Sequence, residues 1–229
     1  MIYKNFQDLK LSALGMGPMR LPVVGDDDGV IDEAAATAMV ATAMKQGINY
    51  YDTAWGYHNG QSEIVLGKAL KAYPRENFYL ADKFPGYDLA NMDKVEEIFE
   101  AQLKKCGVTY FDFYLFHNVC EMNIDAYLNP DYGIFDYLKK QRDEGRIRHL
   151  GFSAHGNYDV MKRFLEAYGD DMEFCQIQLN YLDWSFQDAK AKVELLTEYH
   201  IPVWVMEPLR GGRLCRLTDE EEKILKSMR

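Results

Sequence analysis

Short runs of β-branched and aromatic residues recur along this chain, and segments with helical spacing of apolar residues separate them. The runs end roughly 30 residues apart, which is the length of one strand–helix unit in a parallel sheet. The alternation continues without a break in composition. It therefore predicts one α/β domain over residues 1–229, a TIM-type (β/α)8 barrel rather than a sandwich or a helical bundle. The expected strands are 13–17, 48–52, 78–83, 111–116, 147–153, 174–179 and 201–206.

The segments between these runs predict the helices of the barrel. Asp32 precedes an alanine-rich segment and is the expected cap of the first helix, and Thr218 is the expected cap of the last. Residues 2–12 predict a small hairpin that plugs one end of the barrel, and residues 118–130 predict a loop. The expected helices are 32–46, 62–70, 92–106, 133–144, 158–168, 187–199 and one that begins at residue 219.

The number of strands falls one short of a closed barrel. Seven strands are predicted, and the eighth βα unit is missing from the sequence. An open seven-stranded barrel would expose two strand edges, which tend to pair with other chains. We therefore expect that the chain is a fragment, or that its C-terminal part lies beyond Arg229.

Charge and cysteine content narrow the classes of partner. The net charge is −10, which argues against nucleic acid or an anionic membrane surface as a partner. The four cysteines form no Cys-x-x-Cys pair, so no metal site is expected, and a reduced cytoplasmic setting is the simpler interpretation. We find no signal peptide and no membrane-spanning run, and we interpret the acidic run 26–28 as a solvated turn.

Three consecutive expected strands each end in an ionisable residue. These residues are Asp52, Lys83 and His117, and Tyr57 follows Asp52 after a turn that Gly56 allows to bend. In a parallel β/α barrel the carboxyl ends of all strands open onto one face, where such barrels carry their active sites. The four side chains are therefore candidates for one catalytic site.

This arrangement resembles the catalytic tetrad of the aldo-keto reductase superfamily, and Asp-Thr-Ala-x-x-Tyr at 52–57 and Gly-x-Ser-Glu at 60–63 match as well. The resemblance implies hydride transfer from NADPH or NADH to an aldehyde or ketone, with Tyr57 as general acid. Lys83 would lower the pKa of Tyr57, Asp52 would pair with Lys83, and His117 would orient the substrate oxygen. Taken singly, these residues could equally be a rim tyrosine, a structural ion pair and a hydrogen-bonded core histidine.

The resemblance also implies a cofactor site at the later strand ends. Ser153 and Gln176 fall where the family contacts the nicotinamide amide, and Met206 falls where it often stacks a tyrosine. The glycine-rich loop that follows could cradle phosphate with help from Arg210 or Arg213, or could be a plain turn. Ser-Ala-His at 153–155 departs from the family's Ser-Asn. The implied cofactor-binding residues are Ser153, Gln176, Met206, Pro208, Leu209, Gly211 and Gly212.

Residues 151–155 and 206–212 look most like bacterial aldo-keto reductases that carry a C-terminal ferredoxin-like iron–sulfur extension. An iron–sulfur cluster, and a redox partner for it, would then require an extension beyond Arg229. The family's basic residues for the 2′-phosphate lie on the eighth unit, so the choice between NADP and NAD stays open.

Two other functions remain open at this point. The chain could be a nucleotide-binding regulatory or partner subunit with the same fold. It could also be an aldolase that uses Lys83 as a Schiff base, although pairing with Asp52 would keep that amine protonated. The small-molecule carbonyl substrate cannot be identified from the loops.

Overall fold

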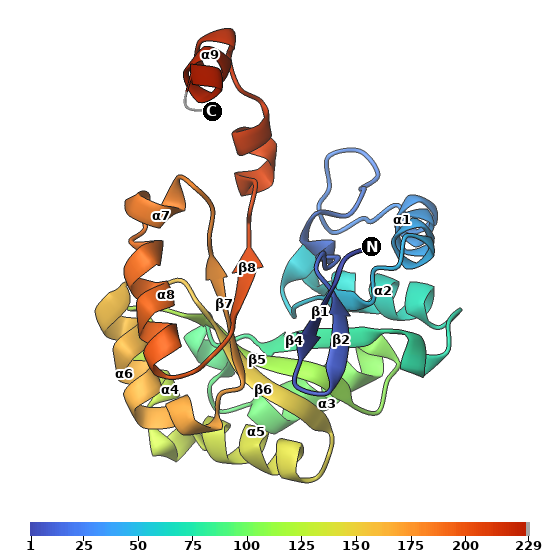
Figure 1. Ribbon diagram of the computed structural model, residues 1–229. Helices are drawn as coiled ribbons and strands as arrows, with labels where there is room; N and C mark the ends of the chain where they lie inside the picture. Colours follow the sequence, from blue (N-terminus) through green and yellow to red (C-terminus); the bar gives the residue numbers. More distant parts are fainter. Residues whose placement is uncertain (228–229) are drawn as a thin grey trace.

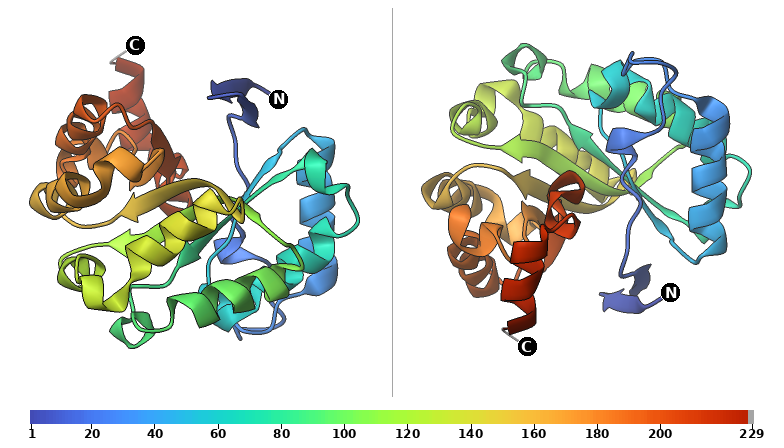
Figure 2. Two further views of the ribbon diagram at one scale, coloured as in Figure 1. Left: turned by 90° about the horizontal axis from the view of Figure 1, so that it is seen from below. Right: turned by 90° about the horizontal axis from the view of Figure 1, so that it is seen from above.

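The computed structural model describes residues 1–227 and contains a two-stranded hairpin and a six-stranded parallel sheet (Figure 1). Each strand of the parallel sheet pairs with the next along the chain, in the order β3-β4-β5-β6-β7-β8. The sheet curls into a half-barrel with helices along its outside (Figure 2), which confirms the predicted TIM-type α/β class. The strands are β1 (Tyr3–Phe6), β2 (Leu9–Ser12), β3 (Tyr50–Asp52), β4 (Tyr79–Phe84), β5 (Phe111–Val119), β6 (Ile147–Ala154), β7 (Phe174–Gln178) and β8 (Val203–Met206).

The helices follow the predicted segments, and the two predicted caps are confirmed. The Asp32 carboxylate accepts the Ala35 N–H at 2.9 Å. Thr218 and Glu221 form a reciprocal capping box, since the Thr218 N–H donates to Glu221 at 2.7 Å and the Glu221 N–H donates to Thr218 Oγ1 at 3.3 Å. The helices are α1 (Glu33–Lys45), α2 (Ser62–Leu70), α3 (Val95–Cys106), α4 (Ile124–Tyr127), α5 (Ile134–Asp143), α6 (Tyr158–Tyr168), α7 (Asp183–Phe186), α8 (Ala189–Glu198) and α9 (Asp219–Ser227).

The prediction of a first barrel strand at 13–17 is wrong. This segment runs beside β3 but forms a single bridge, between Met16 and Tyr51. Two hydrogen bonds make the contact, from Met16 N–H to the Tyr50 carbonyl at 2.9 Å and from Asp52 N–H to the Met16 carbonyl at 3.0 Å. Gly15 lies against the Tyr50 ring, where a Cβ atom would come within 2.7 Å of it. The parallel sheet therefore has six strands instead of the seven expected.

The predicted loop at 118–130 is also partly wrong. Strand β5 continues into it as far as Val119, and helix α4 occupies its middle. The buried Asn123 side chain holds this segment, because its amide donates to the Asn118 carbonyl at 2.8 Å and to the Gly86 carbonyl at 3.1 Å. The segment expected to be a loop is thus an ordered wall of the barrel mouth.

Aromatic rings close the end of the half-barrel where the strands begin. Phe6, from the predicted and confirmed hairpin, packs against Phe113 and Trp204, with ring centroids 5.7 and 5.5 Å away. Tyr50 on β3 meets Trp204 on β8 edge-on at 4.8 Å, so the two outer strands of the sheet converge here without hydrogen-bonding. The carboxyl ends of the strands are left as the open end.

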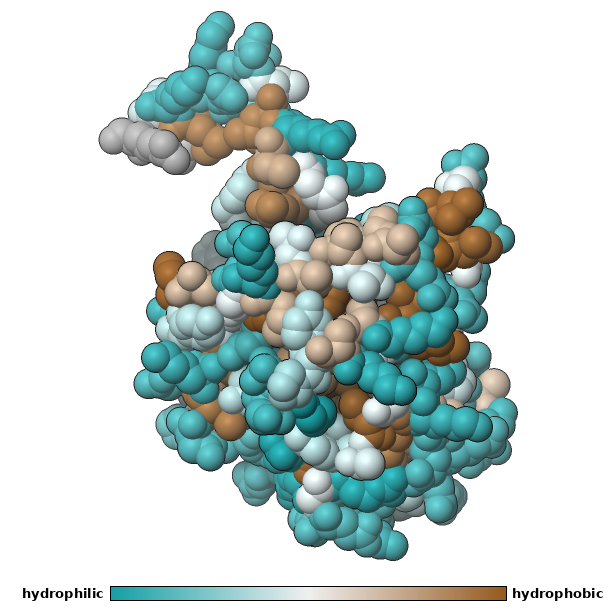
Figure 3. Space-filling model, turned by 90° about the vertical axis from the view of Figure 1, so that its right-hand side faces the viewer, coloured by the Kyte–Doolittle hydropathy of each residue, from teal (hydrophilic) through white to brown (hydrophobic). Residues whose placement is uncertain are grey.

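Strand β8 is an edge strand, and the chain leaves the body after it. Within residues 1–227, β8 pairs with β7 alone. A short 3₁₀ segment (Arg210–Cys215) and α9 then stand away from the half-barrel (Figures 1 and 3), and α9 contains no buried residue. Its apolar residues Ile224 and Leu225 are exposed. Of the helices in the described part of the chain, none is long and apolar enough to cross a membrane.

Candidate active site

The ends of β3, β4 and β5 bring the four candidate catalytic residues together. Asp52 is the last residue of β3, Lys83 is the penultimate residue of β4, and His117 lies near the end of β5. Tyr57 begins the 3₁₀ turn that follows β3. The parallel register of the three strands aligns these positions at the open end of the half-barrel.

Lys83 is the buried cation of the site. Its ammonium forms an ion pair with Asp52 Oδ1 and donates to the Thr53 carbonyl at 2.7 Å. The second oxygen of Asp52 accepts from Gln176 Nε2 at 2.5 Å and from the Tyr50 hydroxyl at 2.9 Å. Burial acts to lower the pKa of Lys83, but the charges of Asp52 and Tyr57 outweigh it and hold that pKa above its ordinary value. A protonated amine is a poor nucleophile, which weighs against a Schiff base at Lys83.

Tyr57 lies between Lys83 and His117. The Lys83 Nζ atom is 5.1 Å from the centroid of the Tyr57 ring, and the His117 ring meets Tyr57 edge-on at 6.1 Å. Burial raises the pKa of Tyr57, and the Lys83 ammonium opposes this without reversing it. Lys83 thus acts on the pKa of Tyr57 in the predicted direction, but burial is the larger effect and the pKa stays above its ordinary value.

His117 is a buried neutral imidazole. Its ring is also edge-on to Tyr87, at 5.2 Å, and its Nδ1 atom has no hydrogen-bond partner among the described residues. Burial, reinforced by the nearby Lys83 charge, holds the pKa of His117 well below its ordinary value. An uncharged imidazole with an unsatisfied buried nitrogen is suited to binding a polar ligand atom.

A second buried histidine fixes the turn that carries Tyr57. His58 and Asn59 adopt left-handed backbone conformations, with φ of 52° and 53°. The His58 Nε2 atom accepts the Leu21 N–H at 2.8 Å, so its Nδ1 carries the proton and donates to the Asp28 carbonyl at 2.8 Å. The turn is thereby tied to the loop between the Met16 bridge and α1.

A glycine is needed at position 56 because of a neighbouring side chain, and not because of its backbone conformation. Its φ of −90° and ψ of −5° are accessible to other residues, contrary to the expectation that it provides the bend. A Cβ atom at this position would instead overlap the Tyr87 hydroxyl. Tyr87 therefore closes over the Tyr57 turn on one side and packs against His117 on the other.

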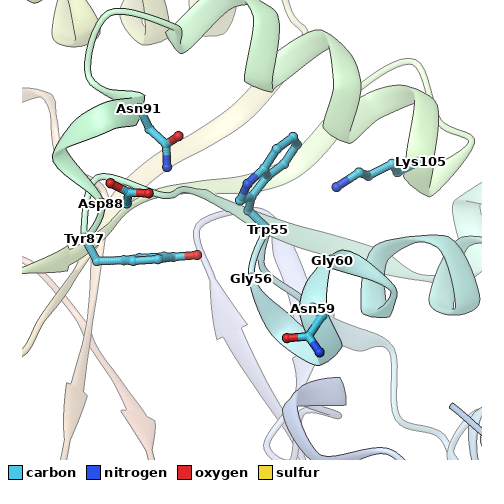
Figure 4. Close-up of a pocket in the computed structure, with 8 residues that line it drawn as sticks. All are labelled: Trp55, Gly56, Asn59, Gly60, Tyr87, Asp88, Asn91 and Lys105. Carbon is cyan, nitrogen blue, oxygen red and sulfur yellow. The ribbon is translucent and has the colours of Figure 1, made fainter. Parts of the chain in front are cut away.

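A hollow of about 380 Å³ lies beside this contact (Figure 4). The Trp55 indole and the Tyr87 ring border it, and Lys105 Nζ lies 3.6 Å from the centroid of the Trp55 ring. Its polar groups are amides, a carboxylate and an ammonium. The lining residues are Trp55, Gly56, Asn59, Gly60, Tyr87, Asp88, Asn91 and Lys105.

The candidate cofactor residues follow one another along the other half of the sheet. Ser153 and Gln176 are register partners at the ends of β6 and β7, and Met206 ends β8. The Ser153 hydroxyl oxygen accepts the Asn118 N–H at 2.8 Å, which leaves its own hydrogen to donate. Gln176 already donates to Asp52, so it belongs to the Lys83 support as well. Pro208, Leu209, Gly211 and Gly212 lie in the segment after β8.

A hollow of about 390 Å³ adjoins that segment, and three of its six lining residues are arginines. Gly211 and Gly212 have φ of 65° and 90°, so backbone there turns in a way that favours glycine. Arg20 reaches Glu207 at 3.6 Å, and Arg210 reaches the buried Asp183 at 3.2 Å. The lining residues are Arg20, Gln178, Glu207, Arg210, Gly211 and Arg213, a set that fits an anionic group.

Two contributors to the site are missing from the sequence-based prediction. Tyr50 bonds the Asp52 carboxylate, and its position two residues before Asp52 on a strand places both on one face, which is a usable signal. Tyr87 lies in the loop after β4, where nothing in the sequence distinguishes it from other tyrosines. Within residues 1–227, no three His, Cys, Asp or Glu side chains are grouped to hold a metal ion.

Comparison with known proteins shows which proteins this chain is similar to. The NADH-specific methylglyoxal reductase of Escherichia coli is 26% identical over 224 residues, which cover 90% of this chain and 66% of that protein. A probable aldo-keto reductase of Glycine max is 27% identical over 214 residues, covering 90% and 58%. The chain therefore spans less than two thirds of the length of these relatives.

Solved structures agree in fold. The holo form of an aldo-keto reductase from Bacillus halodurans superimposes with a TM-score of 0.74 at 25% identity, covering 95% of this chain and 70% of that one. An aldo-keto reductase from Klebsiella pneumoniae in complex with NADPH gives 0.68 at 20% identity, covering 93% and 71%. The family model described as "Aldo/keto reductase family" matches residues 13–228. The chain belongs to the aldo/keto reductase family.

Proposed function

We propose that this protein reduces an aldehyde or ketone with hydride from NADPH or NADH, and that Tyr57 is the general acid. The observation that carries this proposal is the buried Lys83–Asp52 ion pair directly beside the Tyr57 ring, at the open end of the half-barrel. It is the arrangement needed to stabilise a phenolate after the phenol has released its proton. Membership of the family and the reductases among its relatives support the reaction class.

Each residue has a distinct task in this reaction. Tyr57 donates its hydroxyl proton to the carbonyl oxygen, and burial keeps that proton in place beforehand. Lys83 offsets the negative charge left on Tyr57, and Asp52 holds the ammonium in position. His117, as a neutral imidazole, orients the carbonyl oxygen.

The residues present fit a nicotinamide dinucleotide, which supplies the hydride when bound. Ser153 has a hydroxyl hydrogen to donate, and Gln176 lies beside it in the sheet. The hollow at Gly211, which Arg20, Arg210 and Arg213 also line, suits the diphosphate. A relative of this fold is known in complex with NADPH, and another relative is named NADH-specific.

The first test is a fluorescence titration of the 229-residue chain with NADPH and with NADH, followed by turnover of a carbonyl panel that includes methylglyoxal. We expect saturable binding. Tyr57→Phe should retain binding and lose about 10²–10⁴-fold in kcat, since that is the usual contribution of a positioned proton donor.

Tyr79→Phe is the matched control, because Tyr79 lies at the opposite end of β4 and should leave kcat unchanged. Full activity in Tyr57→Phe would remove Tyr57 from the proposed role. Tight cofactor binding without turnover of any carbonyl would instead favour the regulatory-subunit alternative.

A further inference from the structure

Two carboxylic acids are buried behind the catalytic lysine. Asp82 precedes Lys83 on β4, so its side chain points to the opposite face of the strand, toward the helices. Glu63 lies in the first turn of α2, and both residues have no solvent exposure. Lys105 of α3 donates to Glu63 Oε2 at 2.8 Å.

Among residues 1–227, one buried carboxylate oxygen of this pair lacks a hydrogen-bond donor. Asp82 Oδ1 accepts from the Lys83 N–H at 2.8 Å and from Gln102 Nε2 at 2.9 Å. Glu63 Oε1 is buried and has no donor among the described residues. Asp82 nevertheless belongs to the same buried cluster as Glu63, because Cys106 Sγ lies 3.8 Å from Asp82 Oδ2 and the adjacent Lys105 bonds Glu63. A hydrogen bond between two carboxyl groups requires a proton on one of them.

We infer that Asp82 keeps its proton in the folded protein, donates it to Glu63 Oε1, and thereby serves as a positioning residue for Lys83. Lys105 neutralises Glu63, so the proton belongs on Asp82, the acid without a cationic side chain bonded to it. Burial and the adjacent Glu63 charge raise the pKa of Asp82 well above its ordinary value, in agreement with this assignment.

Hydrogen bonds from this cluster hold both the N–H and the carbonyl group of Lys83. Asp82 accepts the Lys83 N–H, and Gln102 Nε2 donates to the Lys83 carbonyl at 3.0 Å. The Tyr114 hydroxyl in turn donates to Gln102 Oε1 at 2.5 Å. Because a neutral Asp82 carries no charge, the Lys83 ammonium forms its ion pair with Asp52 without competition from Asp82. The titratable groups facing Asp82 are Glu63 of α2, Lys105 and Cys106 of α3, Tyr114 of β5 and Lys83 itself.

Infrared spectroscopy of the full chain tests where the proton is. We expect a carbonyl-stretch band of a protonated carboxylic acid at neutral pH, far above the ordinary aspartate pKa of about 3.9. The band should vanish in Asp82→Asn and persist in Asp171→Asn, a half-buried aspartate paired with Arg142 and Lys139. Absence of the band from the wild-type protein, or its survival in Asp82→Asn, would overturn the inference.

Thermal unfolding against pH gives a second measurement that needs no activity. The unfolded chain releases the Asp82 proton near its ordinary pKa, whereas the folded chain retains it. The wild type should therefore lose stability relative to Asp82→Asn as pH rises above about 4, until the folded Asp82 ionises. Parallel curves for the two proteins would contradict the assignment.

The positioning role rests on the proposed function of Lys83, and it has its own test. In Asp82→Asn the amide can still accept the Lys83 N–H and donate to Glu63, so kcat should stay near the wild-type value. Asp82→Leu can do neither and should lose up to about 100-fold in kcat while still binding NADPH, since small misplacements of catalytic groups have effects of this size. Equal kcat in both variants would refute positioning, and a wild type that turns over no carbonyl would refute the proposed function and leave the infrared result standing.

Discussion

Charge at the open end of the half-barrel is controlled residue by residue. Lys83 keeps its proton because the Asp52 carboxylate pairs with it in a buried position. His117 loses its proton because no paired anion in the described part of the chain offsets the effect of burial. Asp52 can hold its place because Tyr50 and Gln176 satisfy its second oxygen. The protonation of Lys83 and of His117 is thus determined by burial and by their immediate neighbours.

The buried His117 should make stability depend on mildly acidic pH. The unfolded chain takes up a proton on this residue near pH 6.5, whereas in the folded protein its pKa is well below that value. The unfolded state therefore binds more protons as pH falls, and stability decreases by up to about 1.4 kcal/mol per pH unit below that point. Chemical denaturation between neutral and mildly acidic pH measures the slope.

His117→Gln should show a shallower slope over the same range. His200→Asn is the control, because His200 is exposed and Asn tolerates its left-handed backbone conformation, φ 57°. The same slope in all three proteins would contradict a neutral buried His117.

The sequence was sufficient for the residues at strand ends and insufficient for those that meet through helices. Asp52, Lys83 and His117 could be placed together because parallel strands end on one face. The burial of Asp82 and Glu63 in one cluster depends on which side of α2 faces β4, which local periodicity leaves undetermined. The sequence predicts a backbone role for Gly56 because it does not reveal that Tyr87, in the loop after β4, approaches this residue.

At the scale of elements, α2 and α3 pack with their backbones in contact. Gly67 of α2 lies against Cys106 of α3, and a Cβ atom there would be 2.5 Å from the Cys106 carbonyl oxygen. The close approach brings Lys105 to Glu63, so this packing also supports the acid pair behind Lys83.

Gly67→Ala should therefore destabilise the fold by about 1–3 kcal/mol, the usual effect of overpacking, despite the better helix propensity of alanine. Urea unfolding measures it. Gly17→Ala is the matched control, because nothing lies within 4 Å of a Cβ atom there and its φ is negative. A change in Gly67→Ala no larger than in the control would show that the helices can separate without cost.

The sequence predicts helices and strands correctly where interactions within one helical turn determine them. It fails where contacts with distant segments determine them. The Asp32 and Thr218 caps act within one helical turn, so they are readable from sequence. Residues 13–17 contain two glycines and no β-branched residue. Whether they pair along β3 is decided by the Tyr50 ring that Gly15 contacts. Helix α4 depends on the buried Asn123, whose partners lie in other segments.

At the scale of the whole molecule, the half-barrel is unevenly supported. Strands β5 and β6 are buried along most of their length and have neighbours on both sides, whereas β8 is half-exposed at an edge and α9 has no buried residue. Local opening follows such differences in burial.

Native-state hydrogen exchange should therefore show a gradient along the chain. Amides of α9 should exchange almost as fast as an unstructured peptide, β8 should be intermediate, and β5 and β6 should exchange only through global unfolding. Peptide-resolved mass spectrometry measures this. Protection of α9 equal to that of β5 would show that the C-terminal segment docks on the body in solution.

The ring contact between Tyr50 and Trp204 has a practical consequence for following this molecule optically. The chain has three tryptophans, and Trp204 alone is wedged among the aromatic rings that join the two edge strands. Replacing Trp55 and Trp184 by phenylalanine would leave Trp204 as the one tryptophan, which can be excited selectively over the tyrosines. Its emission would then change colour when water enters between β3 and β8, so the chain carries an intrinsic optical gauge of how far its half-barrel has opened.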